Sequence, residues 1–131
     1  MNWRSFECRA RKRMSRHYKC KLNESTPDNS PKKFDMVSHD AKIIGDAKYL
    51  TLVKEKFTPL AKFMVIAGHV WILKELNAKH RFLVFGNQRA VPERWLQRYG
   101  HLVKGVSFFF LSNRGKLEKL TRASSLRSKS A

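Results

Sequence analysis

Two aspartates and a lysine near the middle of the chain have the types and the spacing of a metal-dependent hydrolytic site. Asp35 lies in a predicted strand, 33–38, and Asp46 and Lys48 lie in the next predicted strand, 42–52. A carboxylate inside a strand is disfavoured unless it has a role or an exposed position. Asp46 and Lys48 are two residues apart, so their side chains point to the same side of the strand. Because only a short turn, 39–41, joins the two strands, the two carboxylates can converge.

These side chains supply the parts needed to hydrolyse a phosphodiester. Two or three convergent oxygens form the kind of site that binds Mg²⁺. A lysine beside them can orient or activate a water molecule, or offset the charge of a phosphate. The competing interpretation is a structural ion pair of Lys48 with Asp46 or Asp35.

The charge of the chain indicates a polyanionic partner. Its 131 residues include 28 Lys and Arg against 10 Asp and Glu, a formal net charge of +18. A charge of this size destabilises a compact domain by self-repulsion unless a partner neutralises it. Duplex DNA carries one phosphate charge per ~1.7 Å of axis, so DNA is the expected partner. With 42% hydrophobic residues, the chain is too apolar for a disordered tail and is expected to form one domain, 1–120.

Cysteine content and hydropathy favour a reduced, cytoplasmic setting. Cys8 and Cys20 are too few for a disulfide scaffold, and their spacing does not suit a metal. The N-terminus lacks an apolar run, which predicts no secretory signal. The most apolar stretch, 60–73, contains Lys62 and His69 and is shorter than the ~20 residues that span a bilayer. We therefore expect no membrane partner and interpret this stretch as a buried helix.

The hydrophobic pattern predicts elements in the order α-β-β-β-α-β-α-β. The predicted helices are 2–16, 59–76 and 91–99, and the predicted strands are 18–22, 33–38, 42–52, 81–85 and 106–111. Thr58 and Pro59 are typical of a helix start. Gly45 lies inside its strand and indicates either a bulge or a close approach of another group. Hairpin-linked strands followed by crossover helices predict an α/β fold with a single mixed β-sheet flanked by helices.

Two segments are predicted to lack regular structure, and several polar and aromatic residues are interpreted as structural. Residues 23–31 are rich in turn formers and are predicted to form a loop, and residues 121–131 are predicted to form a basic disordered tail. The helix 59–76 is apolar nearly all round, so His69 within it is interpreted as a core histidine. Trp95 and Tyr99 are expected in the core. The carboxylates expected to face solvent are Glu24, Asp28 and Asp40.

The first predicted helix combines one apolar stripe with a basic surface. Residues at helical spacing on the inward stripe are Trp3, Glu7, Ala10 and Met14. The side chains expected to contact the nucleic-acid backbone from this helix are Arg9, Arg11, Lys12, Arg13 and Arg16. Gln88 and Arg89 directly follow a predicted central strand, where open α/β sheets place their ligands. They are either further candidates for contact with a base edge or phosphate or part of an ordinary polar loop between strand and helix.

The spacing of the central residues resembles the PD-(D/E)XK motif of restriction-endonuclease-like nucleases. Phe34-Asp35 is followed, after ten residues, by Asp46-Ala47-Lys48. In that motif the first aspartate begins one strand and the D-x-K lies in the next, as predicted here. Phe34 stands where the motif has Pro.

This resemblance implies a restriction-endonuclease-like α-β-β-β-α-β core over residues 2–86 with an added α-β unit. It implies an endonuclease that hydrolyses DNA with Mg²⁺ or Mn²⁺. Asp35 and Asp46 would be metal ligands, the Ala47 carbonyl a further ligand, and Lys48 the catalytic lysine. Many members place a glutamate on the first helix, and Glu7 matches that position. A homodimer is also expected by analogy, since many such nucleases act as dimers.

Two other classes of protein fit the composition. In one, the same fold has no activity, and the chain coats or positions nucleic acid as a basic subunit of a larger nucleoprotein particle such as a ribosome. In the other, the basic surface binds an acidic protein, as a regulator or inhibitor does. The nuclease requires Asp35, Asp46 and Lys48 to converge, whereas the binding proteins do not.

Overall fold

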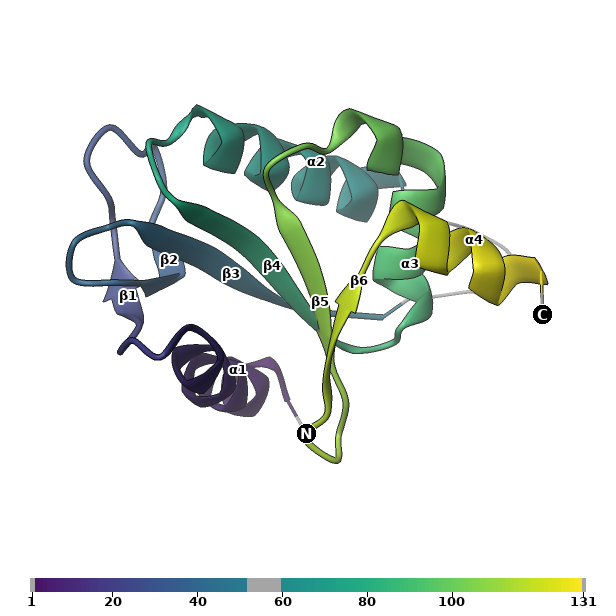
Figure 1. Cartoon of the computed structure of the whole chain (residues 1–131), viewed down its shortest axis with the longest axis horizontal. Coiled ribbons are helices and arrows are strands. Elements are labelled where there is room, and N and C mark those ends of the chain that lie inside the picture. Colours follow the sequence, from purple (N-terminus) through teal and green to yellow (C-terminus); the bar gives the residue numbers. More distant parts are fainter. Residues whose placement is uncertain (1, 52–59, 131) are drawn as a thin grey trace.

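A single open sheet of six strands organises the protein (Figure 1). The computed structural model describes residues 2–51 and 60–130. The elements in chain order are α1 (Trp3–Tyr18), β1 (Asn23–Ser25), β2 (Phe34–Val37), β3 (Ile43–Leu50), α2 (Leu60–Glu75), β4 (His80–Asn87), α3 (Ala90–Tyr99), the 3₁₀ turn η1 (Gly100–Leu102), β5 (Ser107–Leu111), β6 (Leu117–Leu120) and α4 (Arg122–Ser130). The strands lie in the order β1 to β6, and only β3–β4 and β4–β5 are parallel among these pairs. The predicted α/β fold with one mixed sheet flanked by helices is confirmed.

Helices cover both faces of the sheet, with α1 on one side and α2 on the other (Figure 1). Strand β4 is buried on both faces because its side chains alternate between two cores. Phe82 and Val84 pack with α1, whereas Leu83 and Phe85 pack with α2 and α3. The prediction of a central strand at this position is confirmed. Strand β3 lies next to β4 in parallel and presents its own alternating side chains to the same two layers.

Helix α1 has defined ends and a narrow buried stripe. The side chain of Asn2 caps its start by accepting a hydrogen bond from the Ser5 N–H at 2.9 Å. Lys19 ends the helix in a left-handed conformation, with φ 54°. The buried residues are Phe6, Ala10 and Met14. Trp3, predicted in that stripe, is exposed because it lies beside the end of β3, where the sheet ends.

Gly45 is a point of close approach, one of the two predicted alternatives. The Phe82 ring of the neighbouring strand lies 2.3 Å from the position that a Cβ of residue 45 would occupy. A side chain there would displace a ring that is fully buried between the sheet and α1. This glycine therefore lets β3 and β4 pair directly beneath α1.

The N-terminal boundary of the sheet differs from the prediction. Residues 18–22 are not a strand, since α1 continues through Tyr18, whose ring packs 5.4 Å from that of Phe82. The edge strand β1 lies instead within the predicted loop 23–31 and pairs antiparallel with β2. Its three polar residues carry no apolar alternation, so pairing with β2 rather than local propensity defines this strand.

The C-terminal part is more structured than predicted. Residues 106–111 do not form the last strand, because β6 pairs antiparallel with β5. The predicted disordered tail forms α4, which begins with a reciprocal capping box. The Ser124 N–H donates to Thr121 Oγ1 and the Thr121 N–H donates to Ser124 Oγ, each at 3.0 Å. The Gln97 amide donates to the Ser125 carbonyl at 2.9 Å and attaches α4 to α3.

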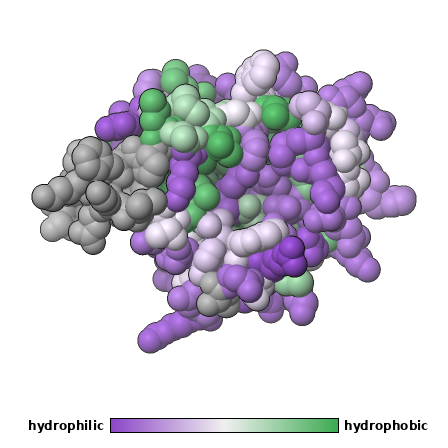
Figure 2. Space-filling model, turned by 180° about the vertical axis from the view of Figure 1, so that it is seen from behind, coloured by the Kyte–Doolittle hydropathy of each residue, from purple (hydrophilic) through white to green (hydrophobic). Residues whose placement is uncertain are grey.

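Helix α2 is not buried all round. Its inner side packs on the sheet, but its outer side exposes large apolar residues: Leu60, Met64, Val65 and Trp71. Figure 2 shows apolar side chains gathered in one region of a largely hydrophilic face. The predicted start of this helix at Thr58 and Pro59, and the predicted strand end at Leu52, lie outside the described residues. Of the helices in the described ranges, none combines the length and apolar character needed to cross a membrane.

Candidate functional site

Asp35 and Asp46 converge where β2 begins beside β3. The antiparallel pairing of Met36 with Gly45 places the two aspartates as the next facing residues. Asp46 Oδ1 accepts a hydrogen bond from the Asp35 N–H at 2.9 Å, and Asp35 Oδ2 accepts one from the Ala47 N–H at 2.9 Å. Each carboxyl is thus anchored to the backbone of the opposite strand. The convergence that the motif requires is present.

Two lysines surround the buried carboxylate of Asp46. Its Oδ2 atom lies 3.2 Å from Lys48 Nζ and 2.9 Å from Lys32 Nζ, and its side chain is only 5% exposed. Burial alone would raise the pKa of Asp46, but the ammonium of Lys48, a hydrogen bond with Asp35 and the ammonium of Lys32 hold it below its ordinary value. Asp46 is therefore ionised, as a metal ligand must be.

Asp35 has the opposite character. Burial, together with a hydrogen bond to Asp46 and the charge of that carboxylate, raises the pKa of Asp35 to about 7. When two carboxyls lie close together, the negative charge of the one that is ionised raises the pKa of the other. A cation placed between them would favour ionisation of both. Burial also lowers the pKa of Lys48, against the opposing pull of Asp46.

His69 joins this group from α2. Its Nδ1 contacts Lys48 Nζ and lies 3.6 Å from Asp46 Oδ2. Burial first, then the neighbouring charges of Lys48 and Lys32, lower the pKa of His69 to about 4. A neutral imidazole accepts a hydrogen bond from the Lys48 ammonium. The interpretation of His69 as a satisfied core histidine fits this arrangement, because its ring is partly buried and has Lys48 and Asp46 as polar partners.

Three carboxylates that lie close together extend the site on the side of α1. Glu7 of α1, Glu24 of β1 and Asp35 each offer one oxygen within 4.8 Å of the other two. Burial raises the pKa of Glu7, while the Arg11 guanidinium opposes that effect. Glu24 is exposed and pairs with Lys33 at 3.1 Å, so its predicted solvent exposure is confirmed. Its proximity to the site was missed because β1 was predicted as a loop.

The donor atoms define which cation would fit. All of the converging ligand atoms are carboxylate oxygens, which hard cations such as Mg²⁺ and Mn²⁺ prefer. Asp35 belongs to both halves of the cluster, since it contacts Asp46 on one side and lies near Glu7 and Glu24 on the other. Glu7, Glu24 and Asp35 are the described residues whose oxygens lie close enough together for one cation, whereas Asp46 directs its Oδ2 atom to Lys32 and Lys48.

The basic residues of α1 run beside this cluster. Arg11 Nε donates to the Asp35 carbonyl at 3.2 Å and links the helix to the start of β2. Arg9 donates to the Ser112 carbonyl at 2.7 Å and attaches α1 to the turn between β5 and β6. Lys12 and Arg16 are exposed, with Arg13 partly exposed, and the first two line a cavity of about 640 Å³ together with Lys21.

The candidates after β4 are held by internal contacts. Arg89 Nε lies 3.0 Å from Glu93 and Arg89 Nη1 lies 2.9 Å from Glu118, and its guanidinium lies over the Phe110 ring. Gln88 precedes it and donates its backbone N–H to the Gly86 carbonyl at 3.0 Å. Trp95 and Tyr99 lie in or against the core, as predicted.

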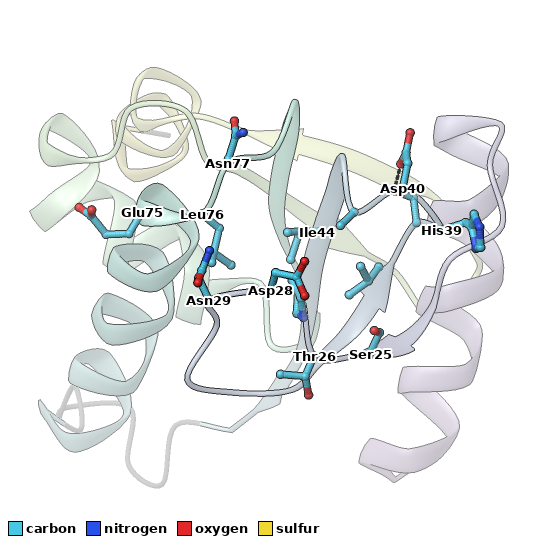
Figure 3. A pocket seen from close by; sticks show the side chains of 14 residues that line it. Ser25, Thr26, Asp28, Asn29, His39, Asp40, Ile44, Glu75, Leu76 and Asn77 are labelled. Carbon is cyan, nitrogen blue, oxygen red and sulfur yellow. Dashed lines mark hydrogen bonds between the residues drawn. The ribbon is translucent and has the colours of Figure 1, made fainter.

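A different cavity, of about 540 Å³, lies where the β2–β3 turn meets the loop after β1 and the end of α2. Among the described residues that line it are three carboxylates, Asp28, Asp40 and Glu75, and neither Lys nor Arg. Figure 3 shows Asp28 near the middle, with Asp40 and Glu75 apart on either side. Asp40 accepts from the Ser38 hydroxyl at 2.7 Å within the predicted turn. None of the predicted site residues lines this cavity.

No protein-family model matches the chain, and no curated protein or solved structure matches it.

Proposed function

We propose that this chain is a metal-dependent endonuclease of the PD-(D/E)XK type that hydrolyses DNA phosphodiester bonds. The observation that carries the proposal is the convergence of Asp35 and Asp46 from paired strands, with Lys48 at 3.2 Å from Asp46. The element order α1-β1-β2-β3-α2-β4 supports it, because it is the order that the family core has. Glu7 on α1 supports it further by lying within reach of Asp35.

In such a reaction the side chains of the site have different roles. Asp35, Asp46 and Glu7, with the Ala47 carbonyl, would hold Mg²⁺ or Mn²⁺. Such a metal would supply polarisation of a phosphate oxygen and a lower pKa for a water molecule. Lys48 presents its ammonium beside the metal ligands, where it orients that water or offsets charge on the phosphate. Lys32 contributes a second positive charge at the same oxygen of Asp46, at 2.9 Å.

DNA is the proposed partner because the charge of +18 and the position of α1 act together. The Arg11 contact with the Asp35 carbonyl places the basic side of α1 directly beside the carboxylates. Phosphates that neutralise this helix are then held next to the site, and the affinity falls with salt. We include a homodimer in the proposal, which sedimentation of the purified chain at several concentrations measures.

The test is cleavage of supercoiled and linear DNA with Mg²⁺, with Mn²⁺ and with EDTA. The variant Asp46→Asn keeps the size of the side chain and removes its charge. Asp40→Asn changes a solvated turn aspartate and is the matched control. Metal-dependent cleavage that Asp46→Asn loses and Asp40→Asn keeps supports the proposal. Cleavage that is absent with every metal, or unchanged in Asp46→Asn, contradicts it.

A second candidate function is non-catalytic binding of nucleic acid within a larger particle. The observation that favours it is the double pairing of Asp46 with Lys32 and Lys48, which satisfies this carboxylate as a structural ion pair. Salt-sensitive DNA binding without cleavage, with folding that Asp46→Asn weakens, is the result expected from this function.

A further inference from the structure

An aromatic cavity opens directly beside the candidate site. Its volume is about 260 Å³, and it lies between the first turn of α1 and the last residues of β3. Three site residues line it: Glu7, Ala47 and Lys48. Trp3 and Tyr49 line it as well. A group bound in this cavity therefore lies next to Glu7 on the α1 side of the sheet, whereas the Lys48 ammonium faces α2.

Trp3 is the exposed aromatic wall of this cavity. Its side chain is 53% exposed, whereas Trp95 in the core is 2% exposed. Trp3 and Glu7 are four residues apart on α1, so the indole and the carboxylate are neighbours on one side of the helix. The indole does not serve the core, and it is positioned by the same helix that positions a proposed metal ligand.

The remaining walls of the cavity are packed against the sheet. Phe6 is 1% exposed, and its ring lies 2.3 Å from the position that a Cβ of residue 86 would occupy, so it packs directly on the backbone of Gly86. The Tyr49 ring lies 5.3 Å from the Phe6 ring. Leu50, the last residue of β3, pairs with Asn87 at the carboxyl edge of the parallel strands. Open α/β sheets bind ligands at this edge.

A cationic side chain, that of Arg4, lies over the indole of Trp3. The Arg4 guanidinium lies 5.2 Å from the centroid of the Trp3 ring. Proteins that bind single-stranded nucleic acid combine aromatic side chains, on which bases stack, with basic groups that follow the backbone. In a regular duplex the faces of the bases are covered by their neighbours, so an indole beside the scissile phosphate has a base to contact only where the strand is unpaired.

We propose that Trp3 is a stacking platform for an unpaired base, and that the substrate class of this chain is therefore DNA with a single-stranded segment at the site. The inference depends on the proposed function only for the phosphate that is cleaved. The stacking itself involves Trp3, Arg4 and the walls of the cavity. A duplex without unpaired bases binds through phosphate contacts alone.

Binding without metal tests the stacking independently of cleavage. In EDTA, the dissociation constants of a fluorescein-labelled single strand and of the duplex of the same length are compared by anisotropy. Trp3→Ala is expected to weaken binding of the single strand by roughly ten-fold and to leave the duplex unchanged. Trp3→Phe, which keeps a stacking ring, restores most of the affinity. Trp71→Ala, which removes the more exposed tryptophan on α2, is the control and changes neither constant.

Tryptophan fluorescence supplies a direct signature. In the Trp71→Phe background, Trp3 is the exposed tryptophan, and stacking on a base quenches its emission when an unlabelled single strand is added. The inference is overturned if Trp3→Ala affects single strand and duplex equally or affects neither, or if the emission is unchanged at saturation. Cleavage of plain duplex with unchanged preference in Trp3→Ala overturns this inference alone. Stacking without cleavage under any metal overturns only the proposed nuclease.

Discussion

The hairpin of β2 and β3 carries aspartates at both of its ends. The two ends differ in the burial of these carboxylates and in the charged groups around them. At the open end, Asp35 and Asp46 are held against each other and beside Lys32 and Lys48. At the turn, Asp40 is exposed and accepts hydrogen bonds from the Ser38 hydroxyl and the Lys42 N–H. The residue type is the same, so the surroundings create the difference.

The pKa values express this contrast. Hydrogen bonds from Ser38 and from the Lys42 backbone lower the pKa of Asp40, which is exposed to solvent. At the open end, burial raises the pKa of Asp35 to about 7, while the lysines keep Asp46 ionised. Neighbouring carboxyls whose pKa values are shifted in opposite directions are typical of functional sites. Convergence under burial, rather than the number of carboxylates, therefore distinguishes the candidate site.

Replacing the buried aspartate should separate the two ends most strongly. Asp46→Asn removes the charge shared by Lys32 and Lys48, and we expect roughly a thousand-fold loss of cleavage, since metal stabilisation contributes several kcal/mol. The same change leaves two partly buried ammonium groups without their carboxylate and costs about 3 kcal/mol of folding free energy. Plasmid nicking and urea unfolding measure the two effects.

Asp40→Asn at the turn is the counterpart. Because Asp40 is exposed and lies at the opposite end of the hairpin from Asp35 and Asp46, the cleavage rate of this variant should equal that of the unaltered chain. Equal losses in the two variants would remove the distinction between the ends of the hairpin.

The pH dependence of Asp35 gives the next largest effect. Its pKa is about 7 in the folded protein, above the value of an unfolded aspartate, so the neutral form is favoured by folding. Its contribution to stability is full below the unfolded pKa and is lost as the pH rises through about 7. We therefore expect Asp35→Asn, which stays neutral, to become more stable than the metal-free unaltered chain as the pH rises from about 5 to about 8. The difference between the two unfolding free energies, followed by urea titration in EDTA, measures this.

The same proton competes with a metal. In the proposed site Mn²⁺ would bind ionised Asp35, so its affinity should rise by about ten-fold per pH unit below the pKa and level off above it. Asp35→Asn should show weaker binding with a smaller pH dependence, since Glu7, whose pKa is also raised, remains as a ligand of the proposed site. A stability difference that is constant over this range contradicts the raised pKa, and metal affinity without a pH dependence contradicts Asp35 as a ligand.

His69 should have a smaller effect that acts through Lys48. His69→Leu removes the acceptor for the lysine ammonium, and a hydrogen bond to a charged group contributes enough for roughly a ten-fold loss of cleavage. His69→Asn places an oxygen near the Nδ1 position and should recover most of the rate. Met64→Ala, an exposed change on the same helix, is the control. The cleavage rate at saturating DNA should change, while the DNA concentration that gives half of that rate stays constant. Equal rates in His69→Leu and His69→Asn would contradict a role of His69 in positioning Lys48.

The sequence predicted the open end of the hairpin because local rules determine it. The two-residue spacing of Asp46 and Lys48 fixes their shared side on any strand, and the short turn brings Asp35 opposite them. The apolar run within β4 required cover on both faces, which α1 and α2 provide. Gly45 was interpreted correctly because a glycine inside a strand commonly marks a bulge or the close approach of another group.

The residues that were missed depend on tertiary pairing. Glu24 reaches the site only because β1, a polar edge strand, pairs with β2. His69 was assigned to the core by its apolar neighbours, and it lies on the same side of α2 as the buried Ile66 and Leu73, which face the strand that carries Lys48. A titratable residue on the sheet-facing side of a helix was the signal present for His69. The sequence contained no comparable signal that Trp3 would be exposed, because its exposure depends on where the sheet ends.

The smallest expected effect belongs to the cavity at the turn. Asp28→Asn with Glu75→Gln removes two of its three carboxylates and raises the formal charge of +18 by two units. DNA binding should tighten slightly through the long-range field, by less than the effect of any change at the open end, and this gain should disappear at high salt. The cleavage rate at saturating DNA should stay the same, since these side chains line a cavity that includes none of the proposed metal ligands. Binding titrations at two salt concentrations check this, with the Asp46→Asn chain in parallel. A large drop in cleavage would mean that the acidic turn takes part in the reaction and that the contrast between the two ends of the hairpin is wrong.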